Sequence, residues 1–183
     1  MKISIYFLLF SLLLFSACSD DDPEIPQEEE LITTLRYTLI PSQGGAPVVL
    51  SFSDPDGEGG NAPVITTSPL QANETYIGSI VVLNESLNPT EDITIEIAEE
   101  AADHQFFFSS SITDLDITYG DSDIDGNPLG LVTELSTGGP GSGSLTIILR
   151  HEPDKNGMGV SEGNIANAGG ETDIEVTFNV QIE

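Results

Sequence analysis

Asp173-Ile-Glu-Val-Thr-Phe-Asn-Val-Gln-Ile182 carries the clearest pattern in the chain, because apolar and polar residues alternate along all of it. Successive side chains of a β-strand point to opposite faces, so this alternation predicts a half-buried strand. Asp173 and the polar residues in phase with it are expected to face solvent. The residues expected in the core are Ile174, Val176, Phe178, Val180 and Ile182.

The same period of two recurs in short runs along the rest of the chain. Turn sequences rich in Gly, Asp, Asn and Pro separate these runs. The pattern predicts a mainly β fold, an antiparallel β-sandwich of immunoglobulin-like type. Residues 76–83 are apolar on both faces and predict a central strand. The other expected strands cover residues 31–39, 48–52, 104–108, 115–119, 145–151 and 174–182.

One segment favours a short helix near residues 89–100. Asn88-Pro89-Thr90-Glu91 has an N-cap residue, a proline at the first helical position and an acid three residues after the cap. Apolar residues follow at helical spacing from Ile93, although isoleucine at every second position from there also suits a strand. We expect the helix to run from about Pro89 to Glu100.

The N-terminal segment predicts export and lipidation. Lys2 precedes an apolar run too short to span a bilayer comfortably, and Ser16-Ala17 supply small residues for cleavage. Cys18 is the only cysteine, so it cannot form an internal disulfide. This junction resembles the lipobox of bacterial lipoproteins, in which the cysteine is lipidated. The alternative is an ordinary secretory signal with a chance cysteine.

The residues after Cys18 predict where the protein is sent. Ser19, Asp20, Asp21 and Asp22 resemble the acidic export sequence that directs lipoproteins of the Bacteroidota to the outer face of the outer membrane. The same acids also suit a solvated tether, and both interpretations can hold. We therefore expect a lipid-anchored, cell-surface protein of the outer membrane. Its expected parts are a signal peptide at 1–17, an acidic tether at 18–30 and one domain at 31–183.

The net charge of the chain limits the classes of partner that it is expected to bind. Lys and Arg number 4 against 31 Asp and Glu, which gives a formal net charge of −27. Such a charge argues against nucleic acid and anionic lipid headgroups, and it raises the local concentration of cations. No arrangement of a nucleophile with a catalytic base is evident in the sequence, so we do not expect an enzyme.

The two histidines are placed in phase with the strand pattern. His104 opens one apolar run and His151 closes another, so both imidazoles are expected on the core side at one end of an antiparallel sheet. Two imidazoles with a carboxylate suit Zn²⁺ or another divalent first-row metal. The alternative is that each histidine is bonded to a local carboxylate or carbonyl. The acids expected to complete a metal site are Glu100, Asp103 and Glu152.

An acidic turn resembles the opening of a calcium-binding loop. Asp121, Asp123 and Asp125 alternate before Gly126, as hard-cation ligands do. Val132 stands where an EF-hand supplies a bidentate Glu, which excludes an EF-hand. A polar turn and a weak calcium site are the two alternatives. The long segment 153–172, rich in Gly and Asn, is expected to be a lid over the histidine end or a disordered loop.

Four segments of the chain, 52–63, 103–107, 149–153 and 167–174, carry a family resemblance. They resemble a family of small Bacteroidota lipoproteins, whose members are labelled "type 1 periplasmic binding fold superfamily protein". The label implies two α/β lobes, whereas the strand pattern predicts a sandwich. The resemblance implies a TonB-dependent outer-membrane receptor as partner. Two functions are expected: capture of a ligand such as a transition metal beside that receptor, or a structural or adhesive role without a small-molecule site.

Overall fold

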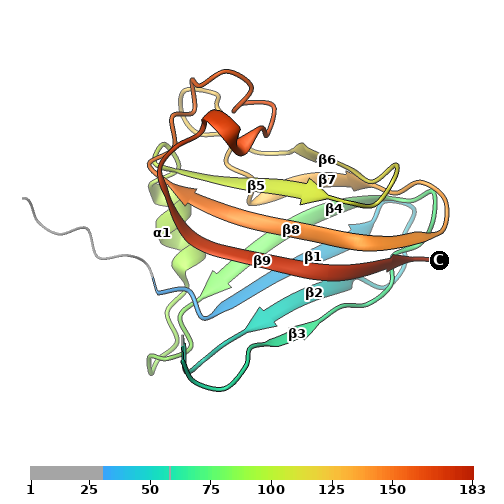
Figure 1. Cartoon of the computed structure of the whole chain (residues 1–183), viewed down its shortest axis with the longest axis horizontal. Helices are drawn as coiled ribbons and strands as arrows, with labels where there is room; N and C mark the ends of the chain where they lie inside the picture. The colour runs from blue at the N-terminus through green and yellow to red at the C-terminus, as the bar shows by residue number, and fades with distance from the viewer. Residues whose placement is uncertain (1–30, 58) are drawn as a thin grey trace, which may run out of the picture.

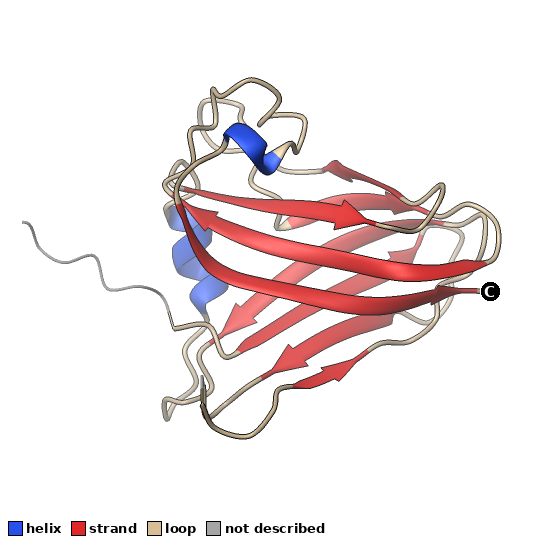
Figure 2. Cartoon of the chain, in the orientation of Figure 1, coloured by secondary structure: helices blue, strands red, loops and turns tan. Residues whose placement is uncertain are grey.

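Two antiparallel β-sheets pack face to face, as Figure 2 shows. The computed structural model describes residues 31–57 and 59–183. The predicted antiparallel sandwich with one short helix is confirmed, whereas an immunoglobulin-like topology is not confirmed. The expected signal peptide, the tether, Cys18 and the export residues 19–22 lie outside the described residues.

Within the described residues, the larger sheet has the strand order β3-β2-β1-β4-β7-β6 and the smaller sheet the order β5-β8-β9 (Figure 1). The larger sheet contains β1 (Thr34–Pro41), β2 (Val48–Ser53), β3 (Val64–Thr66), β4 (Thr75–Leu83), β6 (Asp116–Tyr119) and β7 (Val132–Ser136). The smaller sheet contains β5 (His104–Ser110), β8 (Gly141–His151) and β9 (Glu171–Ile182).

The core lies between the sheets and is built on the alternation of β9. Its five predicted core residues, from Ile174 to Ile182, are each at most 8% exposed. They share one apolar cluster with Leu35, Tyr37 and Leu39 of β1. The prediction for the buried face of β9 is therefore confirmed.

Strand β4 lies inside the larger sheet, as predicted, but only one of its faces is buried. Ile77 on the outer face is 48% exposed. On the inner face, a Cβ atom at Gly78 would lie 2.6 Å from a ring carbon of Tyr37. Glycine at this position lets the Tyr37 ring lie across β4, where its hydroxyl is 2.7 Å from the hydroxyl of Thr133. Burial raises the pKa of Tyr37 to about 12.

Two strands were not expected from the sequence. All three residues of β3 are exposed, so its sequence carries no alternation of buried and exposed residues. In β7 the buried positions are Thr133 and Leu135, while the apolar Val132 is 39% exposed. The apolar pattern that marks the other strands is therefore missing from both segments.

Helix α1 runs over Ile93–Glu99 and starts later than predicted. Its N-cap is Asp92, whose side chain accepts a hydrogen bond from the Thr94 N–H at 3.1 Å. The predicted start at Asn88 and Pro89 is wrong, because Asn84 and Glu91 exchange two backbone hydrogen bonds of 3.0 and 3.1 Å. This pairing encloses the expected cap in a loop, so the helix begins after it. None of the helices in the described residues has the length and apolar character needed to span a membrane.

The connection between β8 and β9 packs on the outer face of the smaller sheet. Val160 and Ala168 of this connection form a small apolar cluster with Phe107 of β5. The side chain of Gln105 donates a hydrogen bond to the Val160 carbonyl at 3.0 Å. The connection also contains the short 3-10 helix η1 (Ile165–Asn167). It therefore covers the face of the sheet that is opposite the histidines, instead of forming the expected lid over them.

Candidate metal centre

His104 and His151 lie directly opposite each other in the pairing of β5 with β8. His104 begins β5 and is fully buried, and His151 ends β8. Their rings stack with centroids 4.7 Å apart and an angle of 22° between the ring planes. The prediction that the two histidines meet at one end of the sheet is therefore confirmed.

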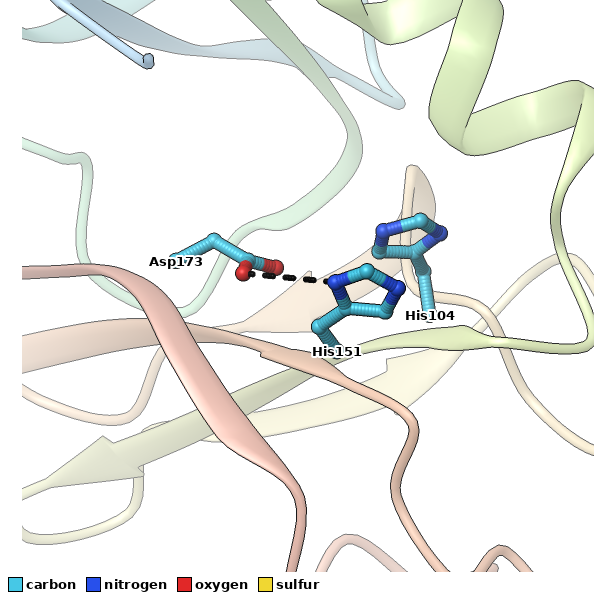
Figure 3. Close-up of side chains that lie close together, drawn as sticks. All are labelled: His104, His151 and Asp173. Carbon is cyan, nitrogen blue, oxygen red and sulfur yellow. Dashed lines mark ion pairs between the residues drawn. The ribbon is translucent and has the colours of Figure 1, made fainter. Parts of the chain in front are cut away.

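Asp173 at the start of β9 is the third member of the group (Figure 3). One ligand atom from each of the three side chains can be chosen so that all lie within 4.8 Å of one another. Asp173 Oδ1 is 3.9 Å from His151 Nδ1, and the two side chains are only 3% and 13% exposed. Two imidazoles and one carboxylate thus meet in a largely enclosed place between the sheets.

A β-bulge explains why Asp173 joins the histidines. Leu149 of β8 pairs with Ile174, but the next residue, Arg150, pairs with Thr172. Asp173 is therefore an extra residue in β9, and such an insertion redirects a side chain. Alternation alone places Asp173 on the solvent face, so that prediction is wrong. The acidic residue next to Ile174 was visible in the sequence, but the bulge depends on pairing with a distant strand.

The three acids expected as ligands lie outside this group. Glu100, Asp103 and Glu152 are all exposed. Glu100 contributes its backbone carbonyl instead, which lies 3.2 Å from His104 Nδ1. Asp103 and Glu152 are joined by a backbone hydrogen bond of 2.6 Å from the Glu152 N–H to the Asp103 carbonyl. These acids thus take part through their backbone, while the carboxylate of the group comes from β9.

The contact with Glu100 assigns the protonation state of one imidazole nitrogen. A carbonyl oxygen only accepts hydrogen bonds, so His104 Nδ1 must carry the hydrogen. The lone pair of neutral His104 is therefore on Nε2, which makes Nε2 its ligating atom. A hydrogen bond from the other ring nitrogen to a carbonyl is the usual way in which proteins orient a metal-binding histidine.

The spacing of the group is close to what a metal ion requires. Two donors that bind a tetrahedral Zn²⁺ at about 2.0–2.1 Å lie about 3.3–3.4 Å apart. The 3.9 Å between His151 Nδ1 and Asp173 Oδ1 is longer than this, so these two atoms must also move closer together on binding. The stacked rings do not yet direct both lone pairs at one point, so one imidazole must turn about its Cβ–Cγ bond. Small side-chain rotations thus separate this arrangement from a ligating one.

Asp173 also lines a cavity at this end of the sandwich. The cavity has a volume of about 620 Å³ and lies between the beginning of the domain, the end of β2 and the start of β9. Its lining residues are Leu31, Ile32, Thr33, Phe52, Asp54, Gly57, Glu171, Thr172, Asp173, Ile174 and Glu175.

Exposed acids surround the same end of the molecule. The connections from β4 to β5 and from β8 to β9 both adjoin the histidine pair, and both carry exposed acids. Negative charge at the mouth of a site attracts cations and raises their local concentration. The exposed acids in these connections include Asp92, Glu99, Glu100, Asp103, Glu152 and Asp154.

Two of the three expected calcium ligands, Asp121 and Asp123, are engaged in other contacts. The Asp121 carboxylate accepts hydrogen bonds from the N–H groups of Gly130 and Val132, at 2.7 and 2.9 Å. Asp123 forms an ion pair of 3.1 Å with the buried Lys155. Calcium binding by the Asp121, Asp123 and Asp125 group would have to displace these contacts, so the structure supports the polar-turn interpretation.

No known protein family matches the chain, and neither the curated proteins nor the solved structures compared with it include a match. The resemblance to Bacteroidota lipoproteins therefore stays a prediction.

Proposed function

We propose that the protein captures a divalent transition metal at His104, His151 and Asp173 while anchored by lipid to the cell surface. The proposal of metal binding is supported by three possible ligand atoms that lie within 4.8 Å of one another. The location rests on the sequence around Cys18 and the acids that follow it. The resemblance stated above supports a TonB-dependent outer-membrane receptor as the partner that accepts the captured ligand.

The donor atoms favour a transition metal over calcium or magnesium. Imidazole nitrogen suits Zn²⁺, Cu²⁺, Ni²⁺ and Fe²⁺, whereas Ca²⁺ and Mg²⁺ prefer oxygen ligands. Two nitrogens and one carboxylate oxygen resemble the three-ligand sets of zinc sites that keep a fourth position open. The exposed acids near the site supply a long-range attraction for the cation before these three side chains bind it.

The backbone holds two of the three ligands in place. The Glu100 carbonyl orients His104, and the bulge turns Asp173 toward His151. Such preorganisation lowers the entropy lost when side chains bind a ligand. A turn of one imidazole out of the stack and a small approach of His151 and Asp173 remain to be made on binding.

Titration of the chain from residue 23 onward with Zn²⁺, followed by calorimetry, tests this proposal. All described strands and the core lie within residues 31–183, so this chain contains the whole sandwich. We expect one site, with affinity at least about tenfold lower in Asp173→Asn, because a neutral amide is a weaker ligand than an anionic carboxylate. His151→Ala should abolish the site. Added salt should remove loose binding to surface acids but not this site.

Asp103→Asn is the matched control, since Asp103 lies close to His104 in the chain but is exposed and outside the group. It should leave the affinity for Zn²⁺ unchanged. Equal losses in Asp103→Asn and Asp173→Asn would assign the binding to general negative charge. Unchanged affinity in both Asp173→Asn and His151→Ala would remove the proposed site and favour a structural or adhesive sandwich.

A further inference from the structure

We infer that the bound metal keeps one coordination position open toward the 620 Å³ cavity, and that the captured species is a metal carrying a small uncharged or cationic donor molecule. This inference rests on the proposed function and names its ligand class. It follows from the position, the size and the lining of the cavity.

Asp173 belongs both to the metal-binding group and to the wall of the cavity. A metal held by Asp173 would therefore lie beside this space. The other two protein ligands, His104 and His151, come from the neighbouring strands β5 and β8. Three protein donors leave one position of a four-coordinate metal for an external donor. The cavity supplies the room for that donor.

The volume of the cavity is larger than a bare ion needs. Small-molecule sites in proteins usually have volumes of about 300–1,000 Å³, and the 620 Å³ cavity falls within this range. Leu31, Ile32 and Phe52 give it apolar walls, and Thr33 and Thr172 contribute polar groups. Such a lining suits a molecule with an apolar body and one polar donor atom.

The charge of the lining selects among donor molecules. The ionisable lining residues are Asp54, Glu171, Asp173 and Glu175, and the lining includes no Lys or Arg. An anionic chelator, such as a polycarboxylate, would meet carboxylates with no cation of the protein to pair with. A neutral nitrogen donor or a positively charged metal complex avoids this repulsion. The chemistry of the lining therefore favours a neutral or cationic donor.

The test uses Co²⁺, whose visible absorption reports changes in its coordination, and 4-phenylimidazole, which has one neutral nitrogen donor and an apolar ring. We expect 4-phenylimidazole to alter the spectrum of the Co²⁺-loaded chain and to reach saturation. The metal-free chain should bind it at least about tenfold more weakly, since the donor–metal bond is missing. Citrate should remove the metal without forming a ternary complex.

Leu31→Trp provides the variant that fills the cavity without touching a metal ligand. Leu31 is 54% exposed and lies outside the strands, so the larger side chain does not enter the core. The affinity of the Leu31→Trp variant for Co²⁺ should stay unchanged, while its spectral response to 4-phenylimidazole should be lost. Leu87→Trp is the matched control, because Leu87 is 49% exposed and does not line the cavity.

The outcomes separate the two proposals. If the chain does not bind Co²⁺ at the group of three residues, the proposed function and this inference both fail. If Co²⁺ binds and 4-phenylimidazole leaves its spectrum unchanged, only this inference fails. If 4-phenylimidazole changes the Co²⁺ spectrum equally in Leu31→Trp and Leu87→Trp, the open position does not face the cavity, and this inference is also overturned.

Discussion

Lys155 is a buried residue whose ammonium group makes three hydrogen bonds to other parts of the chain. It is 5% exposed, and its ammonium group donates hydrogen bonds to Asp123 Oδ2 and to the Pro128 carbonyl, both at 3.1 Å, and to the Ala101 carbonyl. One side chain thus joins three connections that lie far apart in the sequence. A buried charge of this kind depends on its partner, because an unpaired ion is costly to bury.

Asp123→Asn should therefore destabilise the protein by about 3–5 kcal/mol, since it leaves the Lys155 ammonium without a charged partner. Urea unfolding followed by circular dichroism measures this change. Asp125→Asn is the control, because Asp125 is exposed in the same turn and its side chain has no partner among the hydrogen bonds described for that turn. Similar unfolding free energies for the two variants would contradict a structural role for the ion pair.

The same pair predicts a loss of stability in acid. Burial alone raises the pKa of Asp123, but the hydrogen bonds from Lys155 and Asn127 and the charge of Lys155 together lower it. A carboxylate with a lowered pKa stabilises the folded state above its unfolded pKa, and this contribution is lost as pH falls through the folded value. Unfolding free energies should drop below about pH 4, and Asp123→Asn should drop less. Equal acid dependence of the two proteins would contradict this.

Among the strands, β9 has the most regular division between buried and exposed residues. Phe178 is fully buried, and Asn179 beside it is exposed. Phe178→Asp should prevent folding, because an unpaired charge buried in a core costs several kcal/mol, on the order of the whole stability of a small domain. Asn179→Asp should retain the β-type circular dichroism spectrum. A folded Phe178→Asp protein would mean that this face is not the core.

The strands also show how far the sequence predicts the structure. Alternation identified β9, the sandwich and the meeting of His104 with His151, because these depend only on strand phase and antiparallel pairing. Asp173 was missed since a bulge arises from pairing with β8 and leaves no local pattern. The start of α1 was misplaced because the pairing of Asn84 with Glu91 overrides the local cap. In both cases, backbone pairing with another segment, which the local pattern does not reveal, is the reason for the error.

For the protein as a whole, the predicted lipid anchor would determine where the proposed site is presented. Cys18→Ala should release the protein from the membrane, because two or three acyl chains give stable anchoring that the polypeptide alone lacks. Fractionation and labelling with a radioactive fatty acid measure this outcome. A Cys18→Ala protein that is still acylated and membrane-bound would contradict lipidation at this residue.

Replacement of Asp20, Asp21 and Asp22 by Ala tests the export sequence separately. The variant should stay lipidated but lose its exposure on the outer face of the membrane, since only the acidic residues after Cys18 have changed. Digestion of intact cells by an added protease measures this exposure. Unchanged digestion would leave these acids with the role of a tether alone.

The bulge at Asp173 has a consequence for the comparison of related chains. A strand that pairs regularly with β8 would need one residue fewer here, so an alignment of bulged and regular relatives would contain a single-column gap opposite Asp173. The acidic residue lost in that gap is the one that contacts His151. A relative could then retain both histidines and the whole sandwich and still lack the proposed metal site. The gap, more than the overall identity, would separate the binding chains from the non-binding ones.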